Sequence, residues 1–326
     1  MPLQTFEDKI NSLGQGIRPS VLLANGFSQA WDRGIFNYQN LLQQANFGVR
    51  DTTIRDIFKS FNTFDFEKVM RALEAAEIVC KKYAVDQVKI NEIKKDQDHL
   101  KNSLIQVISQ THPLRSSNIT TQQYERAKPF IIQFENIFTL NFDLLLYWIV
   151  NKRDIYPQGY HTGDGFRQTT WENAEDQNVY FLHGGLHIYD DGTLIKKHAF
   201  ISDVDISIVD QVRNNLNHGK FPLFVSEPTC EKKLTRIERN PYLSSCFRAL
   251  KKLSGSLFIH GHSMADNDQH IFDQINKSEV DKVFISIFGN EHTAQNSKTM
   301  ANARRFIDER KIDIEFYDAG SAPIWS

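Results

Sequence analysis

Five short polar segments carry residue types that can bind a small ligand or move a proton, and each follows an apolar run. In chain order they are residues 24–28 (ANGFS), 141–143 (NFD), 183–185 (HGG), 261–263 (GHS) and 289–291 (GNE). Glycine lets a backbone approach a ligand closely, and amide and hydroxyl side chains can hydrogen-bond a phosphate or a sugar. The recurrence of these residue types after apolar runs predicts a nucleotide pocket.

The individual residues suggest separate roles. Gly26 would let backbone amides approach a pyrophosphate, and Ser28 would cap the following helix, although this segment is also typical of a simple turn. Asn141 offers an amide to a water or a sugar hydroxyl, whereas Asp143 most simply caps the next helix. His183 is the best general-base candidate because imidazole titrates near neutrality, but a histidine at a strand end is also often structural.

The apolar runs are predicted to be strands that alternate with helices. The expected strands are residues 20–23, 137–140, 179–182, 223–225, 256–259, 283–288 and 313–317. The expected helices are residues 143–150, 231–253 with a break at Asn240-Pro241, 268–275 and 293–310. This alternation is typical of an α/β fold, here a Rossmann-like parallel sheet of about six to seven strands with helices on both faces. Ligands of such sheets bind beyond the carboxyl ends of the strands, where the polar segments lie.

A long stretch with helical periodicity separates the first two expected strands. Its apolar residues recur at the spacing of one helix face, as in Phe66, Val69, Met70 and Leu73. We expect residues 1–51 and 134–326 to form one Rossmann-like domain, with residues 52–133 as a helical insertion after the first strand. The insertion would serve packing or an oligomer contact, and we expect a homo-oligomer.

The charge balance argues against some classes of partner. The 326 residues include 38 Lys and Arg and 40 Asp and Glu, a formal charge of −2, so no global positive field could hold a nucleic-acid backbone or an anionic membrane. The first residues lack the apolar segment of a secretion signal, and no later stretch reaches about 18 uninterrupted apolar residues. We expect a cytoplasmic protein without direct nucleic-acid binding or membrane contact.

Metal binding is not expected from the sequence. The three cysteines, Cys80, Cys230 and Cys246, are far apart and form no CxxC pair, which argues against a zinc ribbon and a disulfide framework. A group of other ligand residues lies close together, comprising His260, His262, Asp266, Asp268 and His270. Their spacing matches no metal-binding motif.

Residues 261–265 (GHSMA) allow a competing interpretation. They lie between an expected strand and an expected helix, as in the GxSxG turn of serine hydrolases, with Ser263 as nucleophile and residues 183–185 as an oxyanion loop. Ala265 stands where that motif has glycine, and a downstream acid and histidine are not evident in the expected order. Neither the GxxxxGK[ST] nor the GxGxxG phosphate-binding motif occurs.

Taken in chain order, the polar segments resemble those of the SIR2-like (sirtuin-superfamily) NAD-binding domain. The sirtuin segments are GAGxS, GIPDFR, TQNID, HG, GTS and a late Asn after a strand. The corresponding segments here are residues 24–28 (ANGFS), 34–39 (GIFNYQ), 139–143 (TLNFD), 183–184 (HG), 261–263 (GHS) and 289–291 (GNE). The chain is more specifically similar to the bacterial DUF4917 family, through NGFS, TLNFDLLLYW, YFLHGGLHIY, FVSEPTCEKKLTRIERNPYLS and GHSMADND.

The resemblance implies a protein that uses NAD+ as its substrate. Sirtuin deacetylases carry a CxxC…CxxC zinc ribbon, which this chain lacks, so deacetylation is not expected. SIR2-like proteins without the ribbon include antiphage effectors that hydrolyse NAD+. The resemblance therefore implies an NAD+ glycohydrolase acting in abortive infection, together with a trigger or an activating protein partner.

On this resemblance, Asn141 and His183 would be the catalytic residues. Nicotinamide leaves as a neutral group, so Asn141 would position water and the ribose while His183 accepts a proton. The other matched residues would bind the dinucleotide, and they are Gly26, Phe27, Ser28, Asp143, Gly261, Ser263 and Asn290. Two alternatives stay open, a non-enzymatic sensor of NAD+ or ADP-ribose and a serine hydrolase that uses Ser263.

Overall fold

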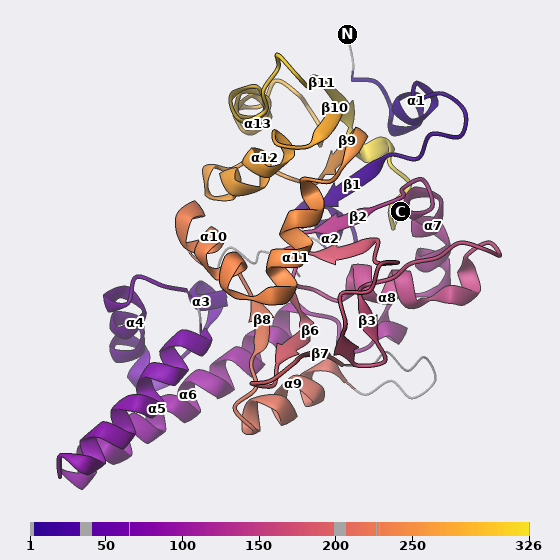
Figure 1. The fold of residues 1–326 in the computed structure, drawn as a ribbon. Coiled ribbons are helices and arrows are strands. Elements are labelled where there is room, and N and C mark those ends of the chain that lie inside the picture. Colours follow the sequence, from indigo (N-terminus) through magenta and orange to yellow (C-terminus); the bar gives the residue numbers. More distant parts are fainter. Residues whose placement is uncertain are drawn as a thin grey trace.

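The computed structural model describes residues 3–32, 41–64, 66–198, 207–225, 227 and 229–325, and a parallel sheet of six strands forms its centre (Figure 1). In spatial order the strands are β11 (Asp313–Asp318), β10 (Glu279–Ile287), β9 (Ser254–His260), β1 (Ser20–Leu23), β2 (Ile137–Thr139) and β5 (Val179–Phe181). Each neighbouring pair runs parallel. The central strands β1 and β2 are buried at every position, because helices cover both faces of the sheet.

The order of these strands identifies the fold. Numbered by their appearance in the chain, the six strands lie in the order 3-2-1-4-5-6, which is that of Rossmann dinucleotide-binding folds. The strand order reverses between β1 and β9, so the loops after these two strands flank the switch point. The Rossmann-like fold predicted from the sequence is therefore confirmed.

The helices predicted around the sheet are present. They are α8 (Leu145–Asn151), α10 (Cys230–Arg239), α11 (Pro241–Leu250), α12 (Gln269–Ile275) and α13 (Ala294–Phe306). The predicted break between α10 and α11 has a local cause. The Asn240 side chain accepts a hydrogen bond from the amide of Leu243 (3.1 Å), and Pro241 occupies the first position of α11, where a missing amide costs little. In Figure 1, α12 and α13 lie on one side of β9, β10 and β11, and α1 (Phe6–Asn11) lies on the other.

The described chain between β1 and β2 is helical, as predicted. Its α-helices are α2 (Asn25–Gln29), α3 (Leu41–Gln44), α4 (Asp51–Ser60), α5 (Phe66–Lys82), α6 (Gln87–Thr111) and α7 (Thr121–Ile131). Helices α5 and α6 form a long hairpin that projects away from the sheet (Figure 1). In contrast, α7 packs against the sheet, with the ring of Phe130 centred 5.3 Å from that of His260 in β9. The boundaries 52–133 of a separate insertion stay a prediction.

A second sheet of five strands was not predicted. In spatial order its strands are β3 (Phe166–Arg167), β4 (Thr170–Trp171), β7 (Ile195–Lys197), β6 (Gly184–Asp190) and β8 (Pro222–Phe224), all antiparallel. The run 223–225 was predicted to join the parallel sheet, and that prediction was wrong, because β8 pairs with β6. An apolar run indicates a buried strand but does not specify its partner. Helix α9 (Ile208–Asn217) precedes β8.

Aromatic side chains fill the space between α1, α7 and the sheet. The ring of Phe6 is centred 5.0 Å from Phe130 and 5.5 Å from Phe258, and Phe258 is 5.6 Å from Tyr317. All four side chains are at most 4 % exposed. This packing joins the first helix to β9 and β11 and so holds the strands that carry the polar segments.

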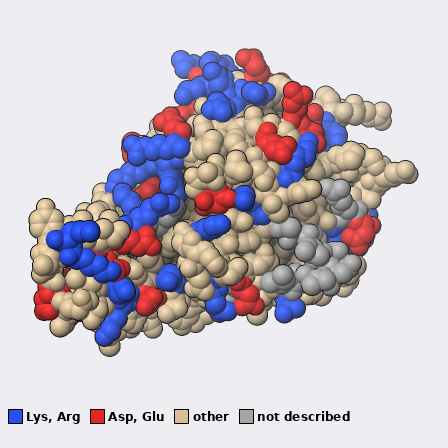
Figure 2. All heavy atoms as spheres, turned by 60° about the horizontal axis from the view of Figure 1, so that its bottom comes forward, with Lys and Arg blue, Asp and Glu red and all other residues tan. Residues whose placement is uncertain are grey.

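Charged side chains of both signs share one face of the molecule (Figure 2). On the face shown in Figure 2, Lys and Arg side chains lie in groups with Asp and Glu between them. Within the described ranges, no helix combines the length and the apolar composition needed to cross a membrane. The expectation that the protein does not bind nucleic acid stays a prediction.

Candidate functional site

The loops after β1 and β9 touch each other at the switch point. The amide of Gly26 donates to the carbonyl oxygen of Gly261 (2.9 Å), and a Cβ on Gly26 would lie 2.5 Å from the Cα of Gly261. Gly261 also has a φ of +74°, a left-handed conformation that favours glycine. Both glycines are therefore needed for the contact between the loops. Their role in binding a dinucleotide stays a prediction.

We expect Gly261→Ala to destabilise the fold by about 2–5 kcal/mol. About 1–2 kcal/mol comes from the left-handed backbone and about 1–3 kcal/mol from forcing the two loops apart. Gly219→Ala is the matched control, because Gly219 has a φ of +71° but nothing within 4 Å of an added Cβ. Urea unfolding measures both variants, and equal losses of stability would mean that the loop contact contributes nothing.

Three polar side chains that follow β1 and β2 form a buried network beside this contact. The Asn141 side chain donates to the hydroxyl of Ser28 (2.8 Å) and to the carbonyl oxygen of Ala24 (3.1 Å). The Ser28 hydroxyl donates to the carboxylate of Asp143 (2.6 Å), which also accepts the amide of Leu145, the first residue of α8 (2.8 Å). Asp143 therefore caps an amide at the start of the next helix, as the sequence predicted.

The side-chain oxygen of Asn141 is buried and has no hydrogen-bond partner among the described residues. The nitrogen of the same amide is held by Ser28 and Ala24, so the orientation of the group is set. Buried acceptors without a partner are uncommon in proteins and call for a water or a ligand. Asn141 therefore presents an oriented acceptor at the carboxyl end of β2.

Burial raises the pKa of Asp143 to about 6, although the hydrogen bonds from Ser28 and Leu145 act in the opposite direction. A carboxyl group with a raised pKa stabilises the fold fully below its unfolded value of 3.8 and loses this contribution as the pH rises through 6. We expect Asp143→Asn to be more stable than the parent chain at pH 8 by about 1–3 kcal/mol and no more stable at pH 3.5. Urea unfolding at the two pH values tests this, and a difference independent of pH would contradict it.

His183 lies at the junction of the two sheets, after β5 and directly before β6. Its side chain is buried, and its carbonyl oxygen accepts the amide of Val225 after β8 (3.0 Å). Burial, together with the positive charge of Lys233, lowers the pKa of His183 well below 6.5, so the imidazole is neutral at physiological pH. Because β5 and β2 are neighbours, His183 and Asn141 follow adjacent parallel strands and lie at the same edge of the sheet.

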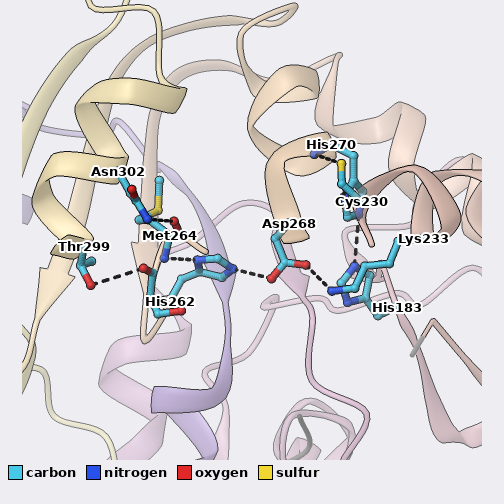
Figure 3. A network of polar contacts seen from close by, with 10 residues as sticks. His183, Cys230, Lys233, His262, Met264, Asp268, His270, Thr299 and Asn302 are labelled. Atoms are coloured by element: carbon cyan, nitrogen blue, oxygen red, sulfur yellow. Dashed lines mark hydrogen bonds and ion pairs between the residues drawn. The ribbon is translucent and has the colours of Figure 1, made fainter. Parts of the chain in front are cut away.

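His183 faces a second histidine that comes from α12 (Figure 3). The Nε2 atom of His183 is 3.4 Å from Nε2 of His270. On the other side of that ring, Nδ1 of His270 is 3.5 Å from Sγ of Cys230, the first residue of α10. Burial lowers the pKa of His270 to about 4, so this ring is also neutral at physiological pH.

Asp268 forms the charged part of the same network. One carboxylate oxygen accepts the ammonium of Lys233 (2.6 Å), and the other is 3.2 Å from Nε2 of His262. Burial would raise the pKa of Asp268, but the contact with His262 and the charge of Lys233 hold it well below 3.8. Titratable groups with shifted pKa values gather at functional sites, so this network is a candidate site.

A family model described as a domain of unknown function, DUF4917, matches residues 21–325. The chain belongs to the DUF4917 family. Among curated proteins, none matches it. Apart from Ser20, the first residue of β1, both sheets and the whole network around His183 lie within the DUF4917 domain.

The remaining predicted ligand-binding residues of the DUF4917 domain have different surroundings. Phe27 is buried, and its ring is centred 5.6 Å from that of Trp325. Ser263 is exposed after β9. Asn290 is exposed after β10, and its side-chain oxygen accepts the amide of His292 (2.9 Å). Their contact with a ligand stays a prediction, and the segment 34–39 lies outside the described residues.

The turn that contains Ser263 differs from a serine-hydrolase nucleophile turn. In that turn the serine occupies a strained position between a strand and a helix. Here the left-handed residues are Gly261 and Met264, and the short η5 (Asp266–Asp268) lies between Ser263 and α12. The ring of His262 accepts the amide of Met264 (2.8 Å) at Nδ1. This geometry does not favour Ser263 as a nucleophile.

The site contains residues that the sequence did not single out. Lys233 was part of an expected helix, and Cys230 was noted only as an isolated cysteine. One signal was available for Lys233, since it lies on the buried face of the strongly amphipathic α10, where a charged side chain needs a partner. That partner is Asp268, which is distant in sequence.

The group of metal-ligand residues noted in the sequence does not converge on one point. His260 is buried in the core, where its Nδ1 is 2.8 Å from the hydroxyl of Tyr317. Asp266 forms an ion pair with Arg305 on α13. The remaining residues, His262, Asp268 and His270, belong to the network around His183.

Proposed function

We propose that this DUF4917 protein is an NAD+ hydrolase (NAD+ glycohydrolase) that cleaves the bond between nicotinamide and ribose. The observation that carries the proposal is the 3-2-1-4-5-6 strand order, because Rossmann sheets bind dinucleotides at the switch point, here beside the loops after β1 and β9. The resemblance of the strand-end segments to those of SIR2-like proteins supports NAD+ as the dinucleotide.

In the proposed reaction, positive charge develops on the ribose as neutral nicotinamide leaves. The protein then has to orient a water molecule and accept its proton. The unpartnered oxygen of Asn141 is suited to orient the water, and the imidazole of His183, unprotonated at physiological pH, can accept the proton. Both residues follow adjacent strands at the same edge of the sheet.

The remaining parts of the proposal concern binding and biological context. Gly26, Gly261 and Ser263 would contact the pyrophosphate, and Asn290 the adenosine ribose, while the buried hydroxyl of Ser28 would hold Asn141 in place. These residues follow β1, β9 and β10 at the carboxyl edge of the sheet. On the SIR2-like resemblance, the protein would act in the cytoplasm as a homo-oligomeric antiphage effector, activated by a trigger or a protein partner.

The proposal is tested by incubating the purified chain with NAD+ and following nicotinamide and ADP-ribose by chromatography. Calorimetry measures NAD+ binding in parallel, and a fluorophosphonate probe reports on reactive serines. Release of nicotinamide together with NAD+ binding is the expected result. NAD+ binding without release would indicate a sensor.

A serine hydrolase would give a different pattern. The probe would label the parent chain but not Ser263→Ala, and NAD+ would neither bind nor be consumed. Under the proposed function, Ser263→Ala raises the KM for NAD+ but leaves kcat at saturating NAD+ close to that of the parent chain, because Ser263 contributes to binding and not to the chemical step.

A further inference from the structure

Two imidazoles and a carboxylate converge within the network of Figure 3. The Nε2 atoms of His183 and His270 are 3.4 Å apart. One ring nitrogen of each histidine and a carboxylate oxygen of Asp268 all lie within 4.8 Å of one another. His183 follows β5, Asp268 ends η5 and His270 lies in α12, so the fold brings together donors from three separate elements.

The spacing of the two nitrogens fits a shared metal ion better than a hydrogen bond. Two nitrogens bound to tetrahedral zinc at about 2.0–2.1 Å are about 3.3–3.4 Å apart. The observed separation is 3.4 Å, which is long for a hydrogen bond from a ring N–H. Two histidines and one carboxylate are also a recurrent ligand set of zinc enzymes and of non-haem iron(II) sites.

We propose that His183, His270 and Asp268 form a binding site for a divalent transition-metal ion, with Zn²⁺ as the expected occupant. A rotation of the Asp268 side chain would bring its carboxylate to the ion that the two imidazoles share. Three protein ligands leave one position of a tetrahedral ion open to water or to another ligand.

The groups around these ligands support the assignment. The Sγ atom of Cys230 accepts the backbone amide of His270 (3.2 Å) and lies 3.5 Å from its Nδ1. In metal-binding histidines the second ring nitrogen usually has a partner, a carboxylate, a backbone carbonyl or water, which fixes the ring. Here the thiol of Cys230 takes that place and leaves Nε2 for the metal. His262 holds the second oxygen of Asp268 in the same manner (3.2 Å).

Lys233 competes with a metal ion for the carboxylate of Asp268. Its ammonium is 2.6 Å from that carboxylate, and its side chain is only 9 % exposed. A bound dication would repel this charge. Removal of the Lys233 charge should therefore strengthen metal binding, whereas removal of a ligand should weaken it. A network with a purely structural role would not produce these opposite effects.

The test measures Zn²⁺ binding to the full chain by competition with a chromophoric chelator. We expect the parent chain to bind one Zn²⁺, and the Co²⁺-loaded protein to show the intense visible bands of a four-coordinate site. His270→Ala should weaken Zn²⁺ binding by at least about 10-fold, and Lys233→Met should strengthen it. His218→Ala, which removes an exposed histidine, is the matched control.

Circular dichroism establishes that each variant is folded, and His270→Gln replaces His270→Ala if the latter is not. The proposal is overturned if the parent chain binds no Zn²⁺, or if His270→Gln and His218→Ala bind it equally well. It is also overturned if Lys233→Met weakens binding as much as the loss of a ligand.

One consequence rests on the proposed function, because His183 is also the proposed general base. Bound Zn²⁺ should inhibit nicotinamide release, and a chelator should restore it. Zn²⁺ binding that leaves nicotinamide release unchanged would reject the role of His183 as base while supporting the metal site. Nicotinamide release without any Zn²⁺ binding would reject the metal site alone.

Discussion

The His183→Ala variant should release nicotinamide from NAD+ about 10²- to 10⁴-fold more slowly than the parent chain, which is the usual loss when a general base is removed. His183 is buried and neutral, so bulk water cannot take over its role. The loss should appear in kcat with little change in NAD+ affinity, because the residue acts on the proton and not on the bound dinucleotide. Chromatography at saturating NAD+ measures the rate, and calorimetry measures the affinity.

Asn141→Ala should cause a loss of similar size, since the oxygen of this amide is the acceptor proposed to orient water. Asn141→Asp is the second variant. It keeps a side-chain oxygen at the same place, but it replaces the amide nitrogen that donates to the Ser28 hydroxyl with a second oxygen. His161→Ala removes an exposed histidine and serves as the control. Circular dichroism checks the fold of each variant. Unchanged nicotinamide release in both His183→Ala and Asn141→Ala would reject the proposed mechanism.

The parallel sheet could be predicted because its strands have a strong local signal. Buried parallel strands are apolar at nearly every position, as in β1, and each is followed by a polar turn. The signal for the break before α11 was also local, because Asn240 caps the helix and Pro241 starts it. The DUF4917 family was also recognisable from the sequence, and its family model matches residues 21–325.

The second sheet could not be predicted, because β6 does not have the pattern of a strand. It begins with Gly184 and Gly185, which were interpreted as part of a ligand-binding segment. The structure gives Gly184 a second reason to be glycine, since it has a φ of +78° and an added Cβ would collide with the backbone of Leu223. Residue type at a strand end therefore did not distinguish a ligand contact from a sheet junction.

Local sequence patterns also could not predict the network around His183. His183 and His270 are 87 residues apart, and Lys233 and Asp268 are 35 residues apart. Motif spacing can reveal ligands that share one helix or one loop, but it carries no information on ligands that different elements bring together. Sequence alone could single out His183 as a candidate general base, whereas its buried partners required the fold.

Three buried histidines outside this network predict that acid unfolds the protein. Burial lowers the pKa of His112 and of His260 to about 4, and that of His187 well below 6.5. Nε2 of His112 accepts the amide of Leu144 (2.9 Å), so protonation there would break a buried hydrogen bond. The ring of His187 stacks on Tyr147 at 4.1 Å, and neither of its nitrogens has a partner among the described residues.

The direction of the pH dependence follows from the lowered pKa values. Such groups contribute stability that is fully present above their unfolded pKa of 6.5 and is lost as the pH falls toward their folded pKa. As the pH falls in this range, each histidine lowers the free energy of unfolding by about 1.4 kcal/mol per pH unit. The three together lower it by about 4 kcal/mol per pH unit. At this rate a stability of about 5–10 kcal/mol, within the typical range, is lost between about pH 5.3 and pH 4, and we expect the chain to unfold there. Circular dichroism during an acid titration measures the midpoint.

The His187→Leu variant measures how much one histidine contributes to the pH dependence of stability. Leucine has a similar volume and accepts no proton, and its introduction leaves no described polar partner unpaired. Between pH 6.5 and pH 5, the slope of the unfolding free energy against pH should fall by about 1.4 kcal/mol per pH unit, as measured by urea unfolding. His218→Leu, at an exposed position, should leave the slope unchanged. The slope separates the titration of a buried ring from the loss of its packing against Tyr147, because lost packing lowers stability equally at every pH.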